Sequence, residues 1–356
     1  MQTRTVCVGG VRLGGGAPVR VQSMTNTDTR DVDATVAQIL ALEEAGCEIV
    51  RASVYDMRCA EAFAEIRRRI HIPLVADVHF DHRLAIAAAE HGADKLRINP
   101  GNIGGAANVR ALVDCAKMHR IPIRIGVNAG SLEQDLKRKY GAASPDAMVE
   151  SALRHVALLE EAGFSDIVIS LKASTVQNTV EAYRRMARTV DYPLHIGITE
   201  TGSVGRGIIK SAIGIGALLL DGIGDTLRVS LTDSPLREVE TGLEILRALN
   251  LLNNDIEIIS CPTCGRTRVD LMQAVRRVEE GVRRKAGYLK IAVMGCAVNG
   301  PGEAEDADIG IAFGATNGLI FKKGEKFLSG PAAEMVERLI LEANAMLGQK
   351  ESGAED

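Results

Sequence analysis

Short apolar runs alternate with longer amphipathic segments between residues 19 and 248. Eight of these runs are rich in β-branched residues and bounded by turns, which is typical of strands. The segments between them, such as ATVAQILALEEAG and ESALRHVALLEEAG, carry apolar residues at helical spacing, and several end at a glycine. The predicted strands cover residues 19–24, 49–54, 74–79, 95–100, 123–128, 167–172, 194–200 and 226–232, and the helix-ending glycines are Gly46, Gly92 and Gly163.

Eight successive strand–helix units predict an α/β protein with a parallel sheet and right-handed crossovers. Eight is also the number of strands that closes a (β/α)₈ TIM barrel, which we prefer to an open, doubly wound sheet. The residues before the first strand, CVGGVRLGGG, predict a short hairpin that could plug the bottom of the barrel.

The regular alternation of strands and helices ends after the eighth helix, which is predicted at 236–248. A strand at 256–260, a helix at 267–284, strands at 289–295 and 308–313, a hairpin around Lys323 and a helix at 332–347 predict a small α+β domain. We therefore expect a barrel domain over residues 1–250, a second domain over 255–348 and a flexible tail over 349–356.

Composition narrows the class of protein. The chain has 46% apolar and 25% charged residues, as globular proteins do, and its net charge of −4 argues against binding to nucleic acid or to a membrane surface. No run approaches a membrane span and the N-terminus lacks an apolar signal core, so we expect a cytoplasmic protein. Seven cysteines in such a chain favour metal or redox chemistry over disulfides.

Charged residues interrupt the predicted barrel strands near their carboxyl ends. Two-residue alternation places Arg97 with Asn99, Asp77 with His79, Arg124 with Asn128 and Arg228 with Ser230 on common faces. A buried charge without a partner costs several kcal/mol, and the nearby acids are too few for the five cations, although any single one could form a structural ion pair. A substrate with two or more negative charges is the better explanation, because barrel enzymes bind substrates at this end. The five cations are Arg51, Arg97, Arg124, Lys172 and Arg228, and Asp77 and Glu200 are the acids of this region.

Glycine-rich turns follow several of these strands. NPGNIGG follows the fourth strand, NAGS the fifth and TGSVGRG the seventh, where it opens a helix. Backbone amides at such turns and helix starts can receive phosphate, which agrees with an anionic substrate.

Three cysteines stand out in the second domain. Cys261 and Cys264 form a CxxC pair after one predicted strand, and Cys296 ends the next. Structural zinc needs four Cys or His ligands, and no histidine follows His195. Three thiolates with a non-cysteine fourth ligand suit a 4Fe-4S cluster; Glu303 is the first carboxylate after Cys296, although its position in an acidic run also fits a solvated surface residue.

These segments together resemble the GcpE (IspG) family of 4-hydroxy-3-methylbut-2-enyl diphosphate synthases, in its bacterial two-domain form. The resemblance rests on VRVQSMTNTDTRD, ADVHFD, LRINPGNIG, IRIGVNAGSL, HIGITETG, SCPTCGRT and MGCAVNGPGEA, and it covers residues 3–345. It implies the two-electron reductive ring opening of 2-C-methyl-D-erythritol 2,4-cyclodiphosphate, with flavodoxin or ferredoxin as electron donor.

The resemblance also implies a role for each matching residue. Cys261, Cys264, Cys296 and Glu303 would bind the 4Fe-4S cluster, and Glu200 would be the catalytic acid or base. Asp77 and His79 would support the site. The diphosphate would be held by Arg51, Arg97, Arg124, Asn128, Lys172, Arg228 and Ser230.

Two other functions stay open on the residues alone: a phosphate-binding barrel transferase with a structural metal, similar to pterin synthases, and an iron–sulfur sensor. We also expect a homodimer with its active site completed in trans. The eighth helix ends at the barrel's bottom, and a linker of about eight residues reaches only about 25–29 Å. The cluster domain can therefore hardly cover the mouth of its own barrel.

Overall fold

The structure is a computed structural model that describes residues 2–99, 101–141, 143–173, 175–199, 202–252, 256–282, 288–296 and 305–352. The chain divides into two compact units, Met1–Leu251 and Leu252–Asp356. Each unit is described by itself below.

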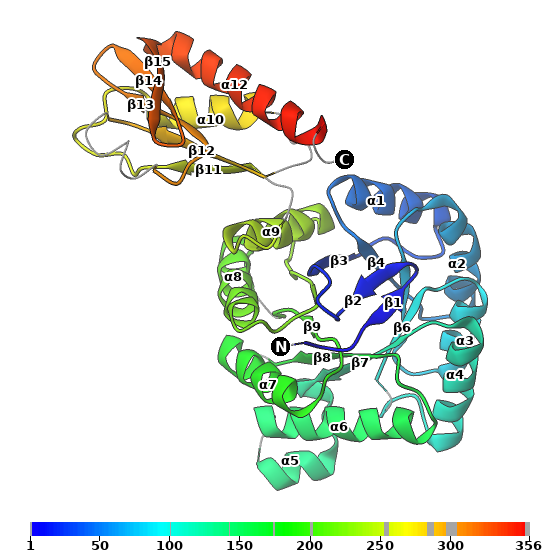
Figure 1. The fold of residues 1–356 in the computed structure, drawn as a ribbon. Coiled ribbons are helices and arrows are strands. Elements are labelled where there is room, and N and C mark those ends of the chain that lie inside the picture. The colour runs from blue at the N-terminus through cyan, green and yellow to red at the C-terminus, as the bar shows by residue number, and fades with distance from the viewer. Residues whose placement is uncertain are drawn as a thin grey trace. The chain divides into compact units, whose positions relative to one another are not determined.

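The first unit is a closed barrel of eight parallel strands (Figure 1). Neighbouring strands pair in the order β8-β7-β6-β5-β4-β3-β10-β9, and a bridge between Ile169 and Leu194 joins the two ends of that order. The predicted barrel is thereby confirmed over the open sheet. The strands are β3 (Arg20–Met24), β4 (Ile49–Ser53), β5 (Leu74–Asp77), β6 (Lys95–Ile98), β7 (Ile123–Asn128), β8 (Ile167–Lys172), β9 (His195–Ile196) and β10 (Thr226–Leu227).

Helices surround this barrel. Side chains at the helix starts, such as Asp31 and Asp56, accept hydrogen bonds from backbone amides, and Gly46 and Gly92 follow helix ends with φ of +95°. The helices are α1 (Val32–Glu44), α2 (Met57–Arg69), α3 (His82–Glu90), α4 (Ala106–His119), α6 (Pro145–Glu161), α7 (Val176–Thr189), α8 (Val204–Leu220) and α9 (Pro235–Ala248). The sequence analysis did not predict η1 (Ala129–Ser131) or α5 (Gln134–Tyr140), which lie between β7 and α6.

The N-terminal hairpin closes one end of the barrel. β1 (Val6–Val8) and β2 (Val11–Leu13) pair antiparallel, as predicted. Their buried side chains pack against Ile49, Val75 and Val168, which lie near the starts of β4, β5 and β8. Figure 1 shows the hairpin across this end. The carboxyl ends of the strands therefore form the open end.

Polar side chains fill the barrel above this apolar seal. Strand registers and two-residue alternation place Gln22, Lys95, Arg124, His195 and Thr226 on its inner surface, and none is more than 3% exposed. His195 Nδ1 lies 2.8 Å from Thr226 Oγ1. The Lys95 ammonium and the Gln22 amide have no hydrogen-bond partner in the described part of the chain. This is an unusual barrel core, since such interiors are normally filled by Val, Ile and Leu.

The second unit is a five-stranded mixed sheet with two helices on one face. β11 (Ile256–Ser260), β12 (Leu289–Met294) and β13 (Ile309–Phe313) run parallel, and β14 (Asn317–Lys322) and β15 (Glu325–Pro331) continue antiparallel. α10 (Leu271–Gly281) and α12 (Ala332–Ser352) bury their apolar faces against one core. α12 extends beyond its predicted end at residue 347 into the predicted tail, and residues 353–356 lie outside the described residues.

Among the residues that the structure describes, no helix has both the length and the apolar character of a membrane span.

Replacing Lys95 by methionine should stabilise the barrel. Burial, and next the positive charge of Arg124, lower the pKa of Lys95 well below its ordinary value. The unfolded chain therefore binds more protons than the folded chain, and the stability of the wild type rises with pH toward the ordinary lysine pKa of about 10.4. We expect Lys95→Met to raise the free energy of unfolding by about 1–4 kcal/mol near neutral pH, and by less at higher pH. Denaturant unfolding of both proteins at several pH values measures this, and a destabilised variant would contradict it.

Candidate active site

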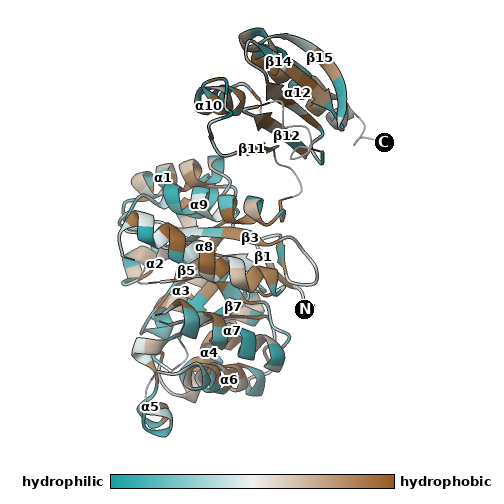
Figure 2. Ribbon diagram, turned by 90° about the vertical axis from the view of Figure 1, so that its left-hand side faces the viewer, coloured by the Kyte–Doolittle hydropathy of each residue, from teal (hydrophilic) through white to brown (hydrophobic). Residues whose placement is uncertain are grey.

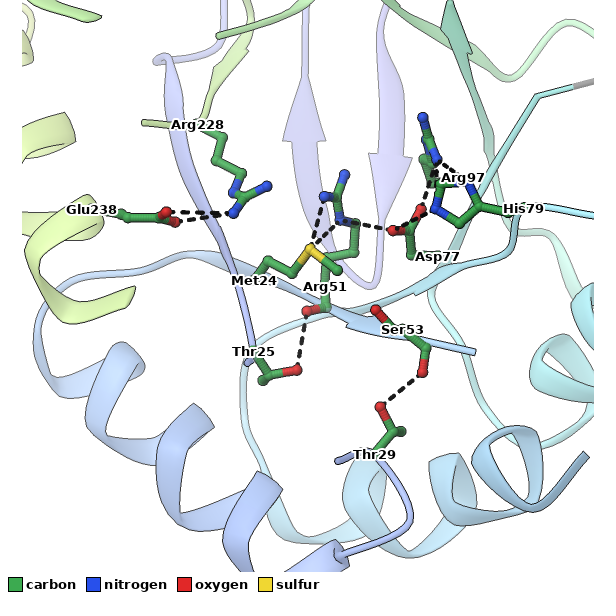
Figure 3. A network of polar contacts seen from close by, with 10 residues as sticks. All are labelled: Met24, Thr25, Thr29, Arg51, Ser53, Asp77, His79, Arg97, Arg228 and Glu238. Atoms are coloured by element: carbon green, nitrogen blue, oxygen red, sulfur yellow. Dashed lines mark hydrogen bonds and ion pairs between the residues drawn. The ribbon is translucent and has the colours of Figure 1, made fainter. Parts of the chain in front are cut away.

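Four predicted site residues form one contact network at the open end of the barrel (Figure 3). Asp77 Oδ1 accepts a hydrogen bond from Arg97 at 3.1 Å, and Asp77 Oδ2 lies 3.7 Å from Arg51 Nε. Arg97 also contacts the ring of His79 at 3.2 Å, while Arg51 lies against the sulfur of Met24. Burial alone would raise the pKa of Asp77, but Arg51, His79 and Arg97 outweigh it, so this pKa falls well below its ordinary value. Asp77 is thus an anion shared by two arginines.

Arg124 lies deeper, and no acid in the described part of the barrel pairs with it. Its side chain is fully buried, and none of its three nitrogens has a hydrogen-bond partner among the described residues. Burial and the charges of Arg51 and Arg97 lower its pKa well below the ordinary value. A guanidinium is a rigid fork of donors, so this arrangement fits an anionic ligand that reaches into the barrel.

Gly126 provides the space for Arg97. It lies on β7 between the inward-facing Arg124 and Asn128, and a Cβ atom at this position would come within 2.6 Å of Arg97 Nε. Because the collision would involve a guanidinium that Asp77 already fixes, any side chain here must displace Arg97.

Lys172 and Asn128 pair in register at the ends of β8 and β7. Both line an open cavity of about 630 Å³, together with Thr199 and the loop residues Ala129, Gly130 and Ser131. Burial, followed by the charge of Arg51, lowers the pKa of Lys172 well below its ordinary value.

The fifth predicted cation, Arg228, pairs with an acid that the sequence analysis missed. Its NH2 group lies 3.2 Å from Glu238 Oε2 of α9, and Glu238 also accepts the amide hydrogen of Leu231 at 2.9 Å (Figure 3). Ser230 is half-buried beyond Arg228. Glu238 is only 5% exposed and occurs among the buried residues of α9. The sequence does contain a signal for this pair, because Glu238 occurs among the apolar residues on one face of its helix.

The described interior therefore has a large excess of positive charge. The sequence analysis also missed Lys95 as an interior cation. The two-residue alternation that places Arg97 and Asn99 on a common face places Lys95 on that face too. Six cations lie in or at the end of the barrel, whereas the acids that pair with them are Asp77 and Glu238. The cations are Arg51, Lys95, Arg97, Arg124, Lys172 and Arg228.

The three predicted cysteine ligands lie at one edge of the second sheet. Ser260 pairs with Val293, so Cys261 and Cys296 follow neighbouring parallel strands at their carboxyl ends. The amide of Gly295 donates to Cys261 Sγ at 3.2 Å, and Cys296 is buried. The backbone amide and side chain of Arg266 lower the pKa of exposed Cys264, which favours its thiolate. In contrast, burial raises the pKa of Cys47, in the barrel, to about 12.

Two predicted site residues, Glu200 and Glu303, lie outside the described residues. Within the part of the chain that is described, no group of three or more His, Cys, Asp or Glu side chains is arranged to hold a metal ion.

The barrel and its buried cations define a class of protein: (β/α)₈ enzymes that bind an anionic substrate at the carboxyl ends of the strands. The chain belongs to the GcpE family, as the sequence resemblance indicated. The model of the GcpE TIM-barrel domain matches residues 3–243, and that of the GcpE protein C-terminal domain matches residues 257–345.

Relatives match over almost the whole chain. The 4-hydroxy-3-methylbut-2-en-1-yl diphosphate synthase (flavodoxin) of Caldanaerobacter subterraneus subsp. tengcongensis is 56% identical and covers 98% of both chains. The enzyme of the same name from Geobacter sulfurreducens is 55% identical and covers 98% of this chain and 99% of its own length.

A solved structure resembles the barrel alone. Dihydropteroate synthase from Yersinia pestis superposes with a TM-score of 0.50 at 13% identity, over 69% of this chain and 97% of its own. At that identity the likeness supports the barrel fold only.

Gly126→Ala should weaken binding of an anionic ligand because the new methyl group displaces Arg97. We expect about a tenfold loss of affinity for the cyclic diphosphate, the size of effect that a misplaced binding group can have. Calorimetric titration measures it. Gly216→Ala, in α8, is the matched control, since a Cβ atom there meets nothing within 4 Å. Equal affinities of Gly126→Ala and the wild type would contradict this role of Gly126.

Proposed function

We propose that this chain is a 4-hydroxy-3-methylbut-2-en-1-yl diphosphate synthase that receives electrons from flavodoxin, the donor named for its relatives. It would convert 2-C-methyl-D-erythritol 2,4-cyclodiphosphate by two-electron ring opening, with loss of one hydroxyl group as water. The observation that carries this proposal is the group of buried cations in a barrel that belongs to the GcpE family.

The barrel residues would divide into two kinds of binding group. Arg124 and Lys172 form no pair with an acid in the described residues, so the diphosphate would supply their counter-charge. Arg51, Arg97 and Arg228 are already oriented by Asp77 and Glu238 and would donate their remaining N–H groups. Asn128 and Ser230 would add neutral hydrogen bonds. Orientation before binding lowers the entropic cost of holding the substrate.

Cys261, Cys264 and Cys296 suit a 4Fe-4S cluster. An amide donates to one sulfur, a second thiol has a lowered pKa, and the third is buried beside the same sheet edge. Glu303 would supply the fourth ligand. When bound, such a cluster supplies electrons one at a time.

Glu200 would hold the proton that converts the departing hydroxyl to water, as a positioned carboxylic acid can do. Asp77 and His79 would support the site indirectly. Asp77 remains ionised and holds two arginines, and His79 orients the guanidinium of Arg97.

The active site would be completed between two chains of a homodimer. α9 ends at Ala248, at the hairpin end of the barrel, whereas the cations lie toward the opposite end, and only residues 249–255 precede β11. Each cluster domain would therefore serve the barrel of the partner chain under one two-fold axis. The exposed apolar side chains of α8 also favour association; they are Ile209, Ile213 and Leu220. Figure 2 shows hydrophobic, brown stretches along the ribbon of α8.

Anaerobic assay of the reconstituted protein tests the function. We expect turnover of the cyclic diphosphate with reduced flavodoxin, and a brown protein. Lys172→Met should weaken substrate binding strongly because it removes a cation that pairs with no acid in the described residues. Exposed Lys326→Met, a control in the second unit, should not. A colourless protein with bound zinc would favour the transferase, and a brown protein inert to phosphates would favour the sensor.

Cys296→Ser should lose the 4Fe-4S cluster or retain a smaller one, because the second unit contains no other cysteine beyond Cys261 and Cys264 to replace it. Cys115→Ser, in a barrel helix, is the matched control and should keep a full cluster. Iron and sulfide analysis with electron paramagnetic resonance distinguishes the two outcomes. A full cluster with normal activity in Cys296→Ser would refute the ligand assignment.

Mixing two inactive chains tests the shared site. Cys296→Ser lacks the cluster and Glu200→Gln lacks the acid, but one of the two sites in a mixed dimer would combine an intact barrel with an intact cluster. We expect partial recovery of activity after subunit exchange, whereas each variant alone stays inactive. If exchange is demonstrated by affinity tags and activity does not return, the shared site is wrong.

A further inference from the structure

Two loops at the open end of the barrel come together on one helix behind them. The loop after β7 contains Ala129, Gly130 and Ser131, which line the cavity beside Lys172. The loop after β6 contains Gly101, whose amide donates to Asn99 Oδ1 at 3.1 Å. Both loops meet α6 at His155, a residue that neither the sequence analysis nor the proposed mechanism uses.

Glu133 connects the first of these loops to α6. Its carboxylate lies 3.2 Å from His155 Nε2 and accepts a hydrogen bond from Ser151 at 2.8 Å. Ser151 and His155 are one helical turn apart and therefore share a face of α6. Two side chains of one helix thus fix the carboxylate that ends the cavity-lining loop.

The state of the ring follows from its surroundings. His155 is only 4% exposed, and burial lowers its pKa although Glu133 opposes this shift. Its Nδ1 has no hydrogen-bond partner in the described part of the chain. A neutral ring with its proton on Nε2, donated to Glu133, satisfies the contact that the structure contains.

The second loop packs directly on the same ring. A Cβ atom at Gly101 would lie 2.9 Å from His155 Nε2 and 3.5 Å from Cε1. A real Cβ atom does not approach another heavy atom as closely as 2.9 Å, so glycine allows the loop after β6 to rest against the imidazole. His155 therefore sets the positions of both loops at once.

We propose that His155 is a positioning residue for the substrate, holding the loops after β6 and β7 in the arrangement that receives the anionic substrate. The proposal rests on the proposed function for the identity of the ligand. It adds a residue on an outer helix that acts through Gly101 and Glu133 without contact with the reacting atoms.

A double-mutant cycle tests the shared contact. Gly101→Ala and His155→Ala should each raise KM for the cyclic diphosphate about 10- to 100-fold, with a smaller change in kcat. The double variant should be no worse than His155→Ala, because removal of the ring makes room for the new methyl group. His155→Gln should retain most of the affinity, since its amide can donate to Glu133 from near the position of Nε2.

Arg154→Ala is the matched control. Arg154 lies on the same helix, is exposed, and pairs with Asp135 of α5 at 2.6 Å and with Glu150 of α6 at 2.8 Å. Neither partner belongs to residues 101–105 or 129–133. It should leave KM unchanged. In hydrogen exchange, His155→Ala should increase exchange at 101–105 and 129–133 together, whereas Arg154→Ala should not.

Three results would overturn the proposal: losses that add up in the double variant, an unchanged KM in His155→Ala, or exchange that increases equally over the whole barrel. A wild-type chain that fails to turn over the cyclic diphosphate would contradict the proposed function instead. The exchange comparison, which needs no substrate, would then decide this proposal.

Discussion

Repulsion between buried cations is the constraint on which the barrel depends. Arg51, Arg97 and Arg124 lie close together on the inner surface and repel one another. In the described part of the chain, the only acid that pairs with any of them is Asp77, which contacts Arg51 and Arg97. At low effective dielectric such repulsion is strong, so the surrounding structure must hold the charges against it. The apolar hairpin seals the end below them, and Glu238, buried on α9, neutralises Arg228. These features stabilise a barrel core whose buried positive charges are energetically unfavourable without a ligand.

The same side chains therefore face two opposing requirements, the stability of the folded barrel and the binding of an anionic ligand. An arginine that a carboxylate fully neutralises would be stable but would attract an anion weakly. Here Asp77 orients two guanidiniums, while none of the nitrogens of Arg124 has a hydrogen-bond partner among the residues that the structure describes. Functional sites of this kind retain unfavourable local interactions, here charge repulsion, that a purely structural core would not contain.

Much of this arrangement could be predicted from the sequence, because period-two alternation and strand order are local properties. The barrel, the hairpin and the inward faces of β5, β6, β7 and β8 follow from them. The pairing of Arg228 with Glu238 and the contact of His155 with Glu133 do not, since each joins a helix to a separate strand or loop. α5 was missed because its seven residues carry a single buried side chain, too few for a periodic pattern.

The hairpin at the bottom of the barrel also bears on the order of events during turnover. Because Val6, Val8 and Leu13 close that end, the ligand proposed at Arg124 would enter and leave at the carboxyl ends of the strands, as far as the described residues show. Under the proposed function, product would have to leave through the opening by which the next substrate enters. Product would therefore compete with substrate for the same cations, to a degree set by its own affinity for them.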